Sequence, residues 1–252
     1  PTDVILIVAT VTLASATMQC AGGVEYMVDL SEKMMRRNPR RITLLAPLIV
    51  YVVCFFSGTG YACFSLLPVI AEVARETGIR PERPLSISVI ASQQAGYSSP
   101  ICAAMAVMIG LFAPSGVHLA AILLVCVPAS LLGLIAGAFY AGRMGPELDS
   151  DPEYLERLKR GEAAPPATAA HAAKSFDSKA KLSTLIFVAG AATVILLAAM
   201  PTLRPVLLYA GKPAVLRVPE CIEMVMMTTA ALIVLACAVK VSRITEMQIY
   251  KA

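Results

Sequence analysis

Apolar residues occur in long runs that are separated by short polar or basic stretches. An α-helix rises about 1.5 Å per residue, so about 20 apolar residues cross a hydrocarbon core of about 30 Å. Residues 4–21, 117–141, 182–200 and 221–239 therefore predict complete membrane spans. Residues 42–71 and 85–113 are also apolar over a comparable length, but each of these runs contains a polar interruption.

The two interruptions are S-G-T-G at residues 57–60 and Y-S-S-P at residues 97–100. An unpaired backbone N–H or C=O in hydrocarbon costs several kcal/mol, so a broken helix persists only where protein or a polar cavity surrounds the break. Secondary transporters hold substrate near the midplane with half-helix ends of this kind. Two such breaks in one short region predict a binding site.

Basic residues set the expected orientation. The cluster at residues 36–41 and the arginines at 75, 80 and 83 lie in short loops, which stay cytoplasmic by the positive-inside rule. Because both loops that flank residues 42–71 are basic, that run is predicted to enter and return as a re-entrant hairpin. Residues 25–35 mix charged and apolar side chains and predict an amphipathic helix at the membrane surface.

These elements predict an all-α, multi-span secondary-transporter fold with a re-entrant hairpin and discontinuous helices. Residues 1–141 would form a first membrane repeat, residues 142–181 a cytoplasmic linker, and residues 182–252 the start of a second, inverted half. Within the linker, Asp151-Pro152 is typical of a helix start. Residues 201–220 would form an external loop. Because the chain begins at Pro1 and is already apolar by Val4, we expect it to be a fragment.

Composition agrees with the membrane class. The chain is 58% hydrophobic and only 15% charged, and its net charge of +4 is placed mainly in loops rather than in a nucleic-acid-binding patch. Seven cysteines without a CxxC pair read as small buried hydrophobes, and two histidines without HExxH argue against a histidine metal site. No nucleotide-binding loop, nucleophile turn or paired intramembrane Asp is present, so we expect no cofactor and no enzyme.

The stretch that contains the second break has no cation. No Lys or Arg occurs from Leu85 to Ala141, so an anion bound there would need backbone N–H groups and the partial positive charge of helix N-termini. Helices that resume at Tyr61 and Ile101 would supply two such ends. The alternative is that each break is only a kink that neighbouring helices satisfy. The candidate substrate-binding residues are Ser57, Gly58, Thr59, Gly60, Gln93, Ser98, Ser99 and Pro100.

Several motifs resemble the anaerobic four-carbon dicarboxylate uptake family, Dcu. They occur in family order along essentially the whole chain and include A-S-A-T-M-Q-C-A-G-G-V-E-Y from residue 14, E-K-M-M-R-R-N-P-R-R from residue 32, S-G-T-G before L-P-V-I-A-E-V-A, I-R-P-E-R-P from residue 79, S-S-P, L-R-P and G-K-P. The I-R-P-E-R-P and G-K-P motifs favour the DcuB-like members over the DcuA-like ones.

The resemblance implies a bacterial inner-membrane protein that exchanges fumarate, malate or aspartate for succinate during anaerobic respiration. A protein of a different class is the alternative: a membrane-embedded, dicarboxylate-responsive partner of a sensor kinase. The sequence leaves open the preferred substrate, the choice between antiport and ion-coupled symport, and whether the chain forms a homo-oligomer.

The orientation can be tested by labelling single introduced cysteines with a membrane-impermeant thiol reagent. We expect a cysteine at Arg37, Arg80 or Lys159 to react only from the cytoplasmic side, and one at Ser115 or Lys212 only from outside. External labelling at Arg80 would contradict the re-entrant hairpin, because residues 42–71 would then cross the membrane completely.

Overall fold

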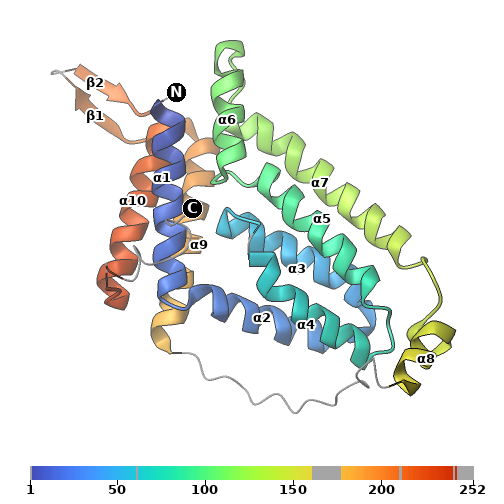
Figure 1. Cartoon of the computed structure of the whole chain (residues 1–252). Helices are drawn as coiled ribbons and strands as arrows, with labels where there is room; N and C mark the ends of the chain where they lie inside the picture. The colour runs from blue at the N-terminus through green and yellow to red at the C-terminus, as the bar shows by residue number, and fades with distance from the viewer. Residues whose placement is uncertain (1, 61, 161–176, 210–211, 241, 243–252) are drawn as a thin grey trace.

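In a computed structural model, the described part of the chain consists of helices joined by turns and loops, with one two-stranded hairpin (Figure 1). The structure describes residues 2–60, 62–160, 177–209, 212–240 and 242. The helices are α1 (Thr2–Cys20), α2 (Gly23–Arg37), α3 (Ile42–Ser57), α4 (Ala62–Glu76), α5 (Glu82–Ser98), α6 (Ala103–Phe112), α7 (Leu119–Ala141), α8 (Pro152–Lys159), α9 (Ser178–Ala199) and α10 (Val218–Cys237). Short connecting elements are the 3-10 turns η1 (Pro39–Arg41), η2 (Ala113–Ser115), η3 (Leu148–Ser150) and η4 (Pro201–Leu203) and the strands β1 (Val206–Tyr209) and β2 (Lys212–Val215).

Four helical segments among the described residues are long and apolar enough to cross a membrane: Pro39–Ser57, Leu119–Ala141, Ser178–Ala199 and Val218–Cys237. A fifth candidate is the pair α1 and α2, which is bent by 71° at a short break. The expected all-α membrane fold is therefore confirmed. The predicted spans at 4–21, 117–141, 182–200 and 221–239 correspond to α1, α7, α9 and α10.

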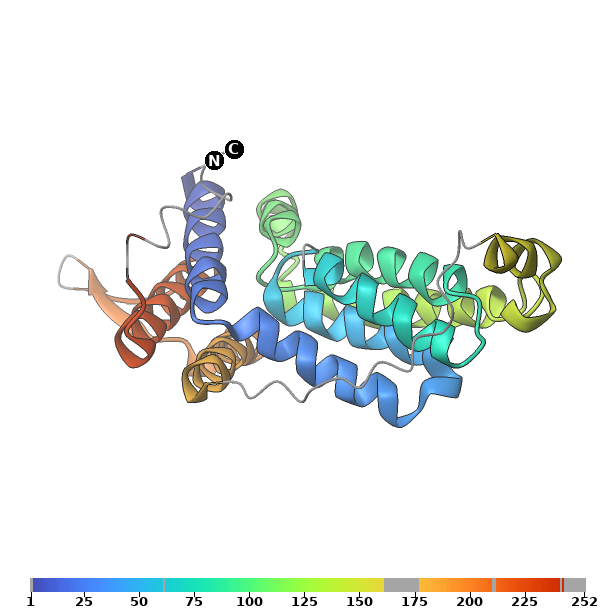
Figure 2. The ribbon, with the colours of Figure 1, turned by 60° about the horizontal axis from the view of Figure 1, so that its bottom comes forward.

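The helices form two groups in space. Helices α1, α9 and α10 pack together on one side, and α3, α4, α5 and α7 pack as a layered group on the other (Figures 1 and 2). Helix α2 contacts α9 in the first group and α4 in the second. Arg36 on α2 pairs with Glu76 on α4 at 2.6 Å, so this helix physically joins the two groups.

Helix α2 has the amphipathic character that its sequence predicts. Its buried residues are Gly23, Met27, Ser31 and Met35, which recur every fourth position and so lie along one face. The turn into α2 needs glycine at two positions. Gly22 has φ +81°, and a Cβ on Gly23 would lie 2.6 Å from Met18 Cγ.

The arms of the predicted hairpin are α3 and α4, which lie side by side in both views (Figures 1 and 2). Helix α4 continues to Glu76, five residues beyond the predicted end at residue 71. The arrangement is compatible with entry and return from one face, and the re-entrant path through the bilayer stays a prediction.

Of two expectations about where helices resume, one needs correction and the other lies outside the described residues. The second helix resumes at Ala103 rather than at Ile101, because Pro100 and Ile101 form a turn in which Cys102 N–H donates to the Ser99 carbonyl at 3.3 Å. The predicted resumption at Tyr61 lies outside the described residues, and α4 is described from Ala62.

The predicted external loop contains structure that the sequence analysis did not anticipate. Strands β1 and β2 pair antiparallel, with Val206 opposite Val215 and Tyr209 opposite Lys212. Val206–Tyr209 contains β-branched and aromatic residues, which favour strands, but its four residues are too few to show a clear alternation.

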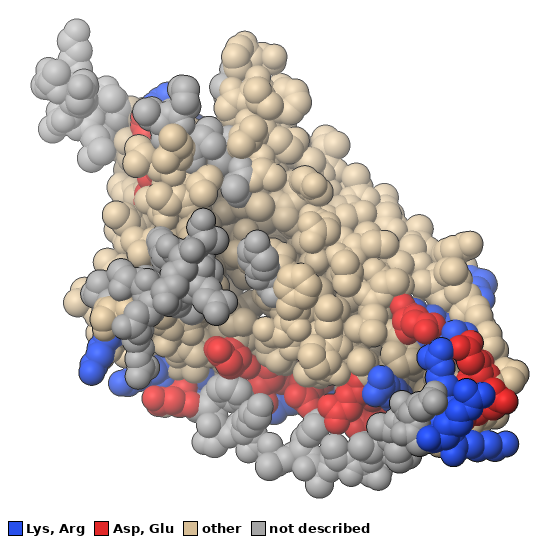
Figure 3. Space-filling model, in the orientation of Figure 1, with Lys and Arg blue, Asp and Glu red and all other residues tan. Residues whose placement is uncertain are grey.

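Charged side chains gather along the lower edge of the molecule, while most of the visible face above them is uncharged (Figure 3). Arg83 lies in the first turn of α5. It is 7% exposed and donates to the Met144 and Gly145 carbonyls at 2.7 and 2.6 Å and to Glu147 at 2.7 Å. These bonds fix the start of α5 against the segment that follows α7.

The short linker helix is confirmed as α8. Asp151 accepts a hydrogen bond from the Glu153 backbone N–H at 3.1 Å, and Pro152 occupies the first helical turn. The Pro165-Pro166 part of the predicted linker lies outside the described residues.

The close packing of α9 on α10 provides a stability test. A Cβ on Gly190 would lie 2.3 Å from Thr229 Oγ1, so Gly190→Ala should force the helices apart and cost about 1 to 3 kcal/mol. Gly133→Ala is the matched control, because its Cβ would lie 3.8 Å from Gln94 and alanine favours a helix. Thermal unfolding of the full-length protein in detergent should show a lowered midpoint only for Gly190→Ala. Equal midpoints for the two variants would contradict this packing.

Candidate functional site

The structure brings the two helix breaks together. Ser99 Oγ donates to the Phe55 carbonyl at 2.7 Å, which joins the second break to the end of α3. A Cβ built on Gly58 would lie 3.0 Å from Ile101 Cγ1 and 3.2 Å from the Ile101 carbonyl oxygen. The chain segments at the two breaks are therefore in direct contact.

The first break follows from local conformational preferences. Gly58 ends α3 in the left-handed region with φ +69°, which a residue with a side chain adopts only at a cost. Ser57 Oγ turns back and donates to the Cys54 and Thr59 carbonyls at 3.2 and 3.0 Å. At the Cys54 carbonyl, the serine thus replaces a donor that the broken helix no longer supplies.

A second set of hydroxyl contacts lies next to Ser99 and joins three helices. The Tyr51 hydroxyl oxygen on α3 lies 2.8 Å from Ser130 Oγ on α7, and Ser130 Oγ lies 3.0 Å from Ser98 Oγ on α5. Ser130 Oγ also lies 2.9 Å from the Val127 carbonyl. These contacts fix the end of α5 between α3 and α7.

Three backbone N–H groups at the two breaks lack an acceptor in the described part of the chain. Those of Gly58, Gly60 and Ile101 donate no hydrogen bond to any described residue. Gly58 and Ile101 are buried and Gly60 is half-buried. A buried N–H without an acceptor is rare and costly, so these groups are suited to an anion or an ordered water.

The predicted residues fall into two sets by their exposure. Ser57, Ser98 and Ser99 are at most 3% exposed, and their hydroxyl groups contact protein oxygen atoms. Thr59 and Gly60 are half-buried, and Gln93 on α5 is exposed. A Cβ on Gly60 would lie 3.7 Å from Gln93 Nε2, so Gly60 and Gln93 flank the same space.

Pro100 has a local role at the second break. It is buried and has no N–H, so it interrupts the backbone hydrogen bonding between α5 and α6. Sequence reasoning missed Tyr51 and Ser130, which brace this break. Both were treated as parts of apolar runs, although a hydroxyl in such a run needs a partner when it is buried. No cluster of three His, Cys, Asp or Glu side chains suited to a metal ion occurs in the described part of the chain.

The fold and the joined breaks define an α-helical, multi-pass membrane protein with a transporter-like broken-helix centre. The profile of the family described as "Anaerobic c4-dicarboxylate membrane transporter" matches residues 1–252. The chain belongs to this family of membrane transporters. A multi-pass protein of the bacterial inner membrane fits its bacterial relatives and the apolar helices of the structure.

Curated relatives agree with the family assignment. The chain is 38% identical over 252 residues to the C4-dicarboxylate transporter DcuA of Helicobacter pylori (strain ATCC 700392 / 26695) and 35% identical over 255 residues to DcuA of Escherichia coli (strain K12). It is 32% identical over 260 residues to the anaerobic C4-dicarboxylate transporter DcuB of Escherichia coli O6:H1. The identity to this DcuB is lower than the identity to either DcuA, which does not support the expectation that the chain is more similar to the DcuB-like members.

All of this chain takes part in each of these matches, and it spans 56 to 57% of the length of these relatives. No solved structure matches the chain.

The hydroxyl contacts around the second break can be tested with a double-mutant cycle. Tyr51→Phe and Ser130→Ala should each lower unfolding stability, and together should lose less than their sum, with a coupling of about 0.5 to 1.5 kcal/mol. The control pair is Tyr97→Phe with Ser130→Ala, because Tyr97 is 60% exposed. Chemical denaturation of the full-length protein measures both cycles. Additivity in the Tyr51 cycle would show that its contact with Ser130 has no energetic weight.

Proposed function

We propose that the protein containing this chain is a secondary transporter that exchanges four-carbon dicarboxylates, taking up fumarate, malate or aspartate and releasing succinate. Its relatives are named C4-dicarboxylate transporters, and the family description includes the word anaerobic. A role in anaerobic respiration follows as part of the same proposal.

The observation that carries the proposal is the set of N–H donors at the joined breaks. Gly58, Gly60 and Ile101 offer three N–H groups without acceptors among the described residues. The start of α4 adds the partial positive charge of a helix N-terminus, which favours a carboxylate. A dicarboxylate could thus be held where the sequence from Leu85 to Ala141 provides no Lys or Arg.

The two sets of site residues would have different roles. Thr59 and Gly60 are half-buried and Gln93 is exposed, so these three residues would contact the substrate. Ser57, Ser98 and Ser99 would instead position the backbone, because their hydroxyls contact protein oxygens. This division refines the expectation that all of these side chains donate to the ligand, and the ligand-binding role stays a proposal.

Neutral donors also suit transport. A site that contained fixed cations would hold a dianion strongly, whereas release on the other side requires weaker, shared interactions. Backbone donors on two helix breaks can separate when either break moves, so one conformational change could release the substrate. Alternating access therefore fits the joined breaks, and exchange without ATP is expected of such a site.

The proposal predicts a difference between two substitutions at one position. Gly60→Leu should fill the space beside Gln93 and block two or more hydrogen bonds to the charged ligand, each worth about 1.5 to 3 kcal/mol. Fumarate affinity should then fall by roughly two to four orders of magnitude. Gly60→Ala is the matched control and should bind within about tenfold of wild type, because its Cβ would have at least 3.7 Å of clearance.

Isothermal titration of the purified full-length protein with fumarate measures this difference. Both variants must show wild-type thermal stability for the comparison to hold. Wild-type affinity in Gly60→Leu would mean that the breaks are kinks and that the substrate binds elsewhere in the full-length protein.

A transport assay separates exchange from the alternative role of a ligand-responsive partner of a sensor kinase. Liposomes that contain the full-length protein and labelled succinate should release label when external fumarate is added. Without external dicarboxylate they should retain it. Fumarate binding without label release would contradict exchange and favour the sensing role.

A further inference from the structure

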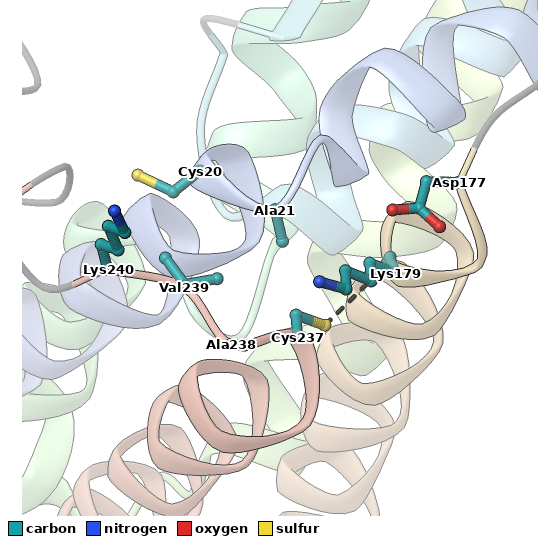
Figure 4. A pocket seen from close by; sticks show the side chains of 8 residues that line it. All are labelled: Cys20, Ala21, Asp177, Lys179, Cys237, Ala238, Val239 and Lys240. Carbon is teal, nitrogen blue, oxygen red and sulfur yellow. Dashed lines mark hydrogen bonds between the residues drawn. The ribbon is translucent and has the colours of Figure 1, made fainter.

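Three helix ends that are distant in sequence form a pocket away from the helix breaks. The pocket has a volume of about 290 Å³. It is bounded by the end of α1, the start of α9 and the segment that follows α10 (Figure 4). Its lining residues are Cys20, Ala21, Asp177, Lys179, Cys237, Ala238, Val239 and Lys240.

The geometry of the α10 end creates this pocket. Ala238 adopts the left-handed region with φ +52°, which turns the chain sharply after Cys237. Cys237 Sγ lies 3.4 Å from the Lys179 carbonyl, which holds the end of α10 against the start of α9. The turn therefore brings Lys240 to the same pocket as Lys179 (Figure 4).

The pocket has an excess of positive charge. Lys179 and Lys240 line it together with one acidic residue, Asp177. Neither lysine has a carboxylate partner among the described residues, and both are exposed. Asp177 precedes α9 but its side chain makes no capping hydrogen bond, so it does not serve as the acceptor for the first N–H groups of α9.

Exposed leucines occur on α9 and α10 near the helix ends that form the pocket. Leu182 lies three residues after Lys179, on the same face of α9, and is 40% exposed. On α10, Leu232 and Leu235 are 55% and 79% exposed just before the turn. Cationic side chains at the end of exposed apolar helices match an amphiphile with an anionic head and acyl chains better than they match a small soluble anion.

We propose that this pocket binds the phosphate headgroup of an anionic glycerophospholipid. Lys179 and Lys240 contact the phosphate, and the acyl chains lie along the exposed leucines of α9 and α10. The lipid thereby links α1, α9 and α10 at one end of their bundle. The predicted orientation places this lipid in the cytoplasmic leaflet. The binding itself depends neither on that orientation nor on dicarboxylate transport.

Native mass spectrometry of the full-length protein, titrated with phosphatidylglycerol, tests the proposal. Each lysine near a phosphate should contribute about fivefold in affinity, so the double variant Lys179→Gln/Lys240→Gln should bind about 20- to 30-fold more weakly. The matched control is Lys181→Gln, which removes the same charge from α9 outside the pocket and should change affinity less than about twofold. The variant Lys179→Arg/Lys240→Arg keeps both charges and should retain binding.

Phosphatidylcholine and glycerol 3-phosphate distinguish the source of the phosphate. Neither should displace phosphatidylglycerol at concentrations near its own Kd. An unchanged affinity in the double glutamine variant would overturn the proposal, and so would an equal loss in Lys181→Gln. Displacement by glycerol 3-phosphate at such concentrations would also overturn it, because the pocket would then recognise a soluble anion. Fumarate exchange by the same variants should remain at the wild-type rate, so a failure here is distinct from a failure of the transport proposal.

Discussion

The requirement that buried backbone polar groups find partners governs the centre of this molecule. Helices α3 and α5 both end inside the layered helix group, where each end leaves carbonyl groups without intrahelical donors. The structure meets part of this requirement by placing the ends together, so that Ser99 donates to the Phe55 carbonyl at 2.7 Å. What remains unpaired among the described residues is a set of N–H donors, which suits an anion or an ordered water.

The rest of the fold holds this junction in place. Tyr51 and Ser130 brace the end of α5 from α3 and α7, and Arg83 fixes the beginning of the same helix. Helix α2 connects this layered group to the group formed by α1, α9 and α10. The junction is therefore supported from several helices, while Thr59, Gly60 and Gln93 beside it are partly or fully exposed.

Much of the fold could be predicted from the sequence because long apolar runs and basic loops have few structural alternatives in a membrane protein. The break at Gly58 and the cap at Asp151 were predictable for the same kind of reason, since left-handed glycine and Asp-Pro have strong local preferences. Long-range partners were not predictable. The pairing of Ser130 with Tyr51 depends on how α7 packs, and the β1–β2 pairing depends on contacts between short strands with little local signal.

The central claim is that both breaks contribute to one dicarboxylate site, and ligand protection of introduced thiols tests it most directly. Cysteines placed singly at Thr59 and Gln93, in full-length protein whose natural cysteines have been replaced, would be alkylated at increasing fumarate concentrations. One shared site predicts that fumarate protects both positions with the same half-maximal concentration. A dicarboxylate that the protein does not bind should protect neither position. Protection at only one position, or at clearly different concentrations, would contradict a single site shared by the first break and α5, the helix that leads into the second break.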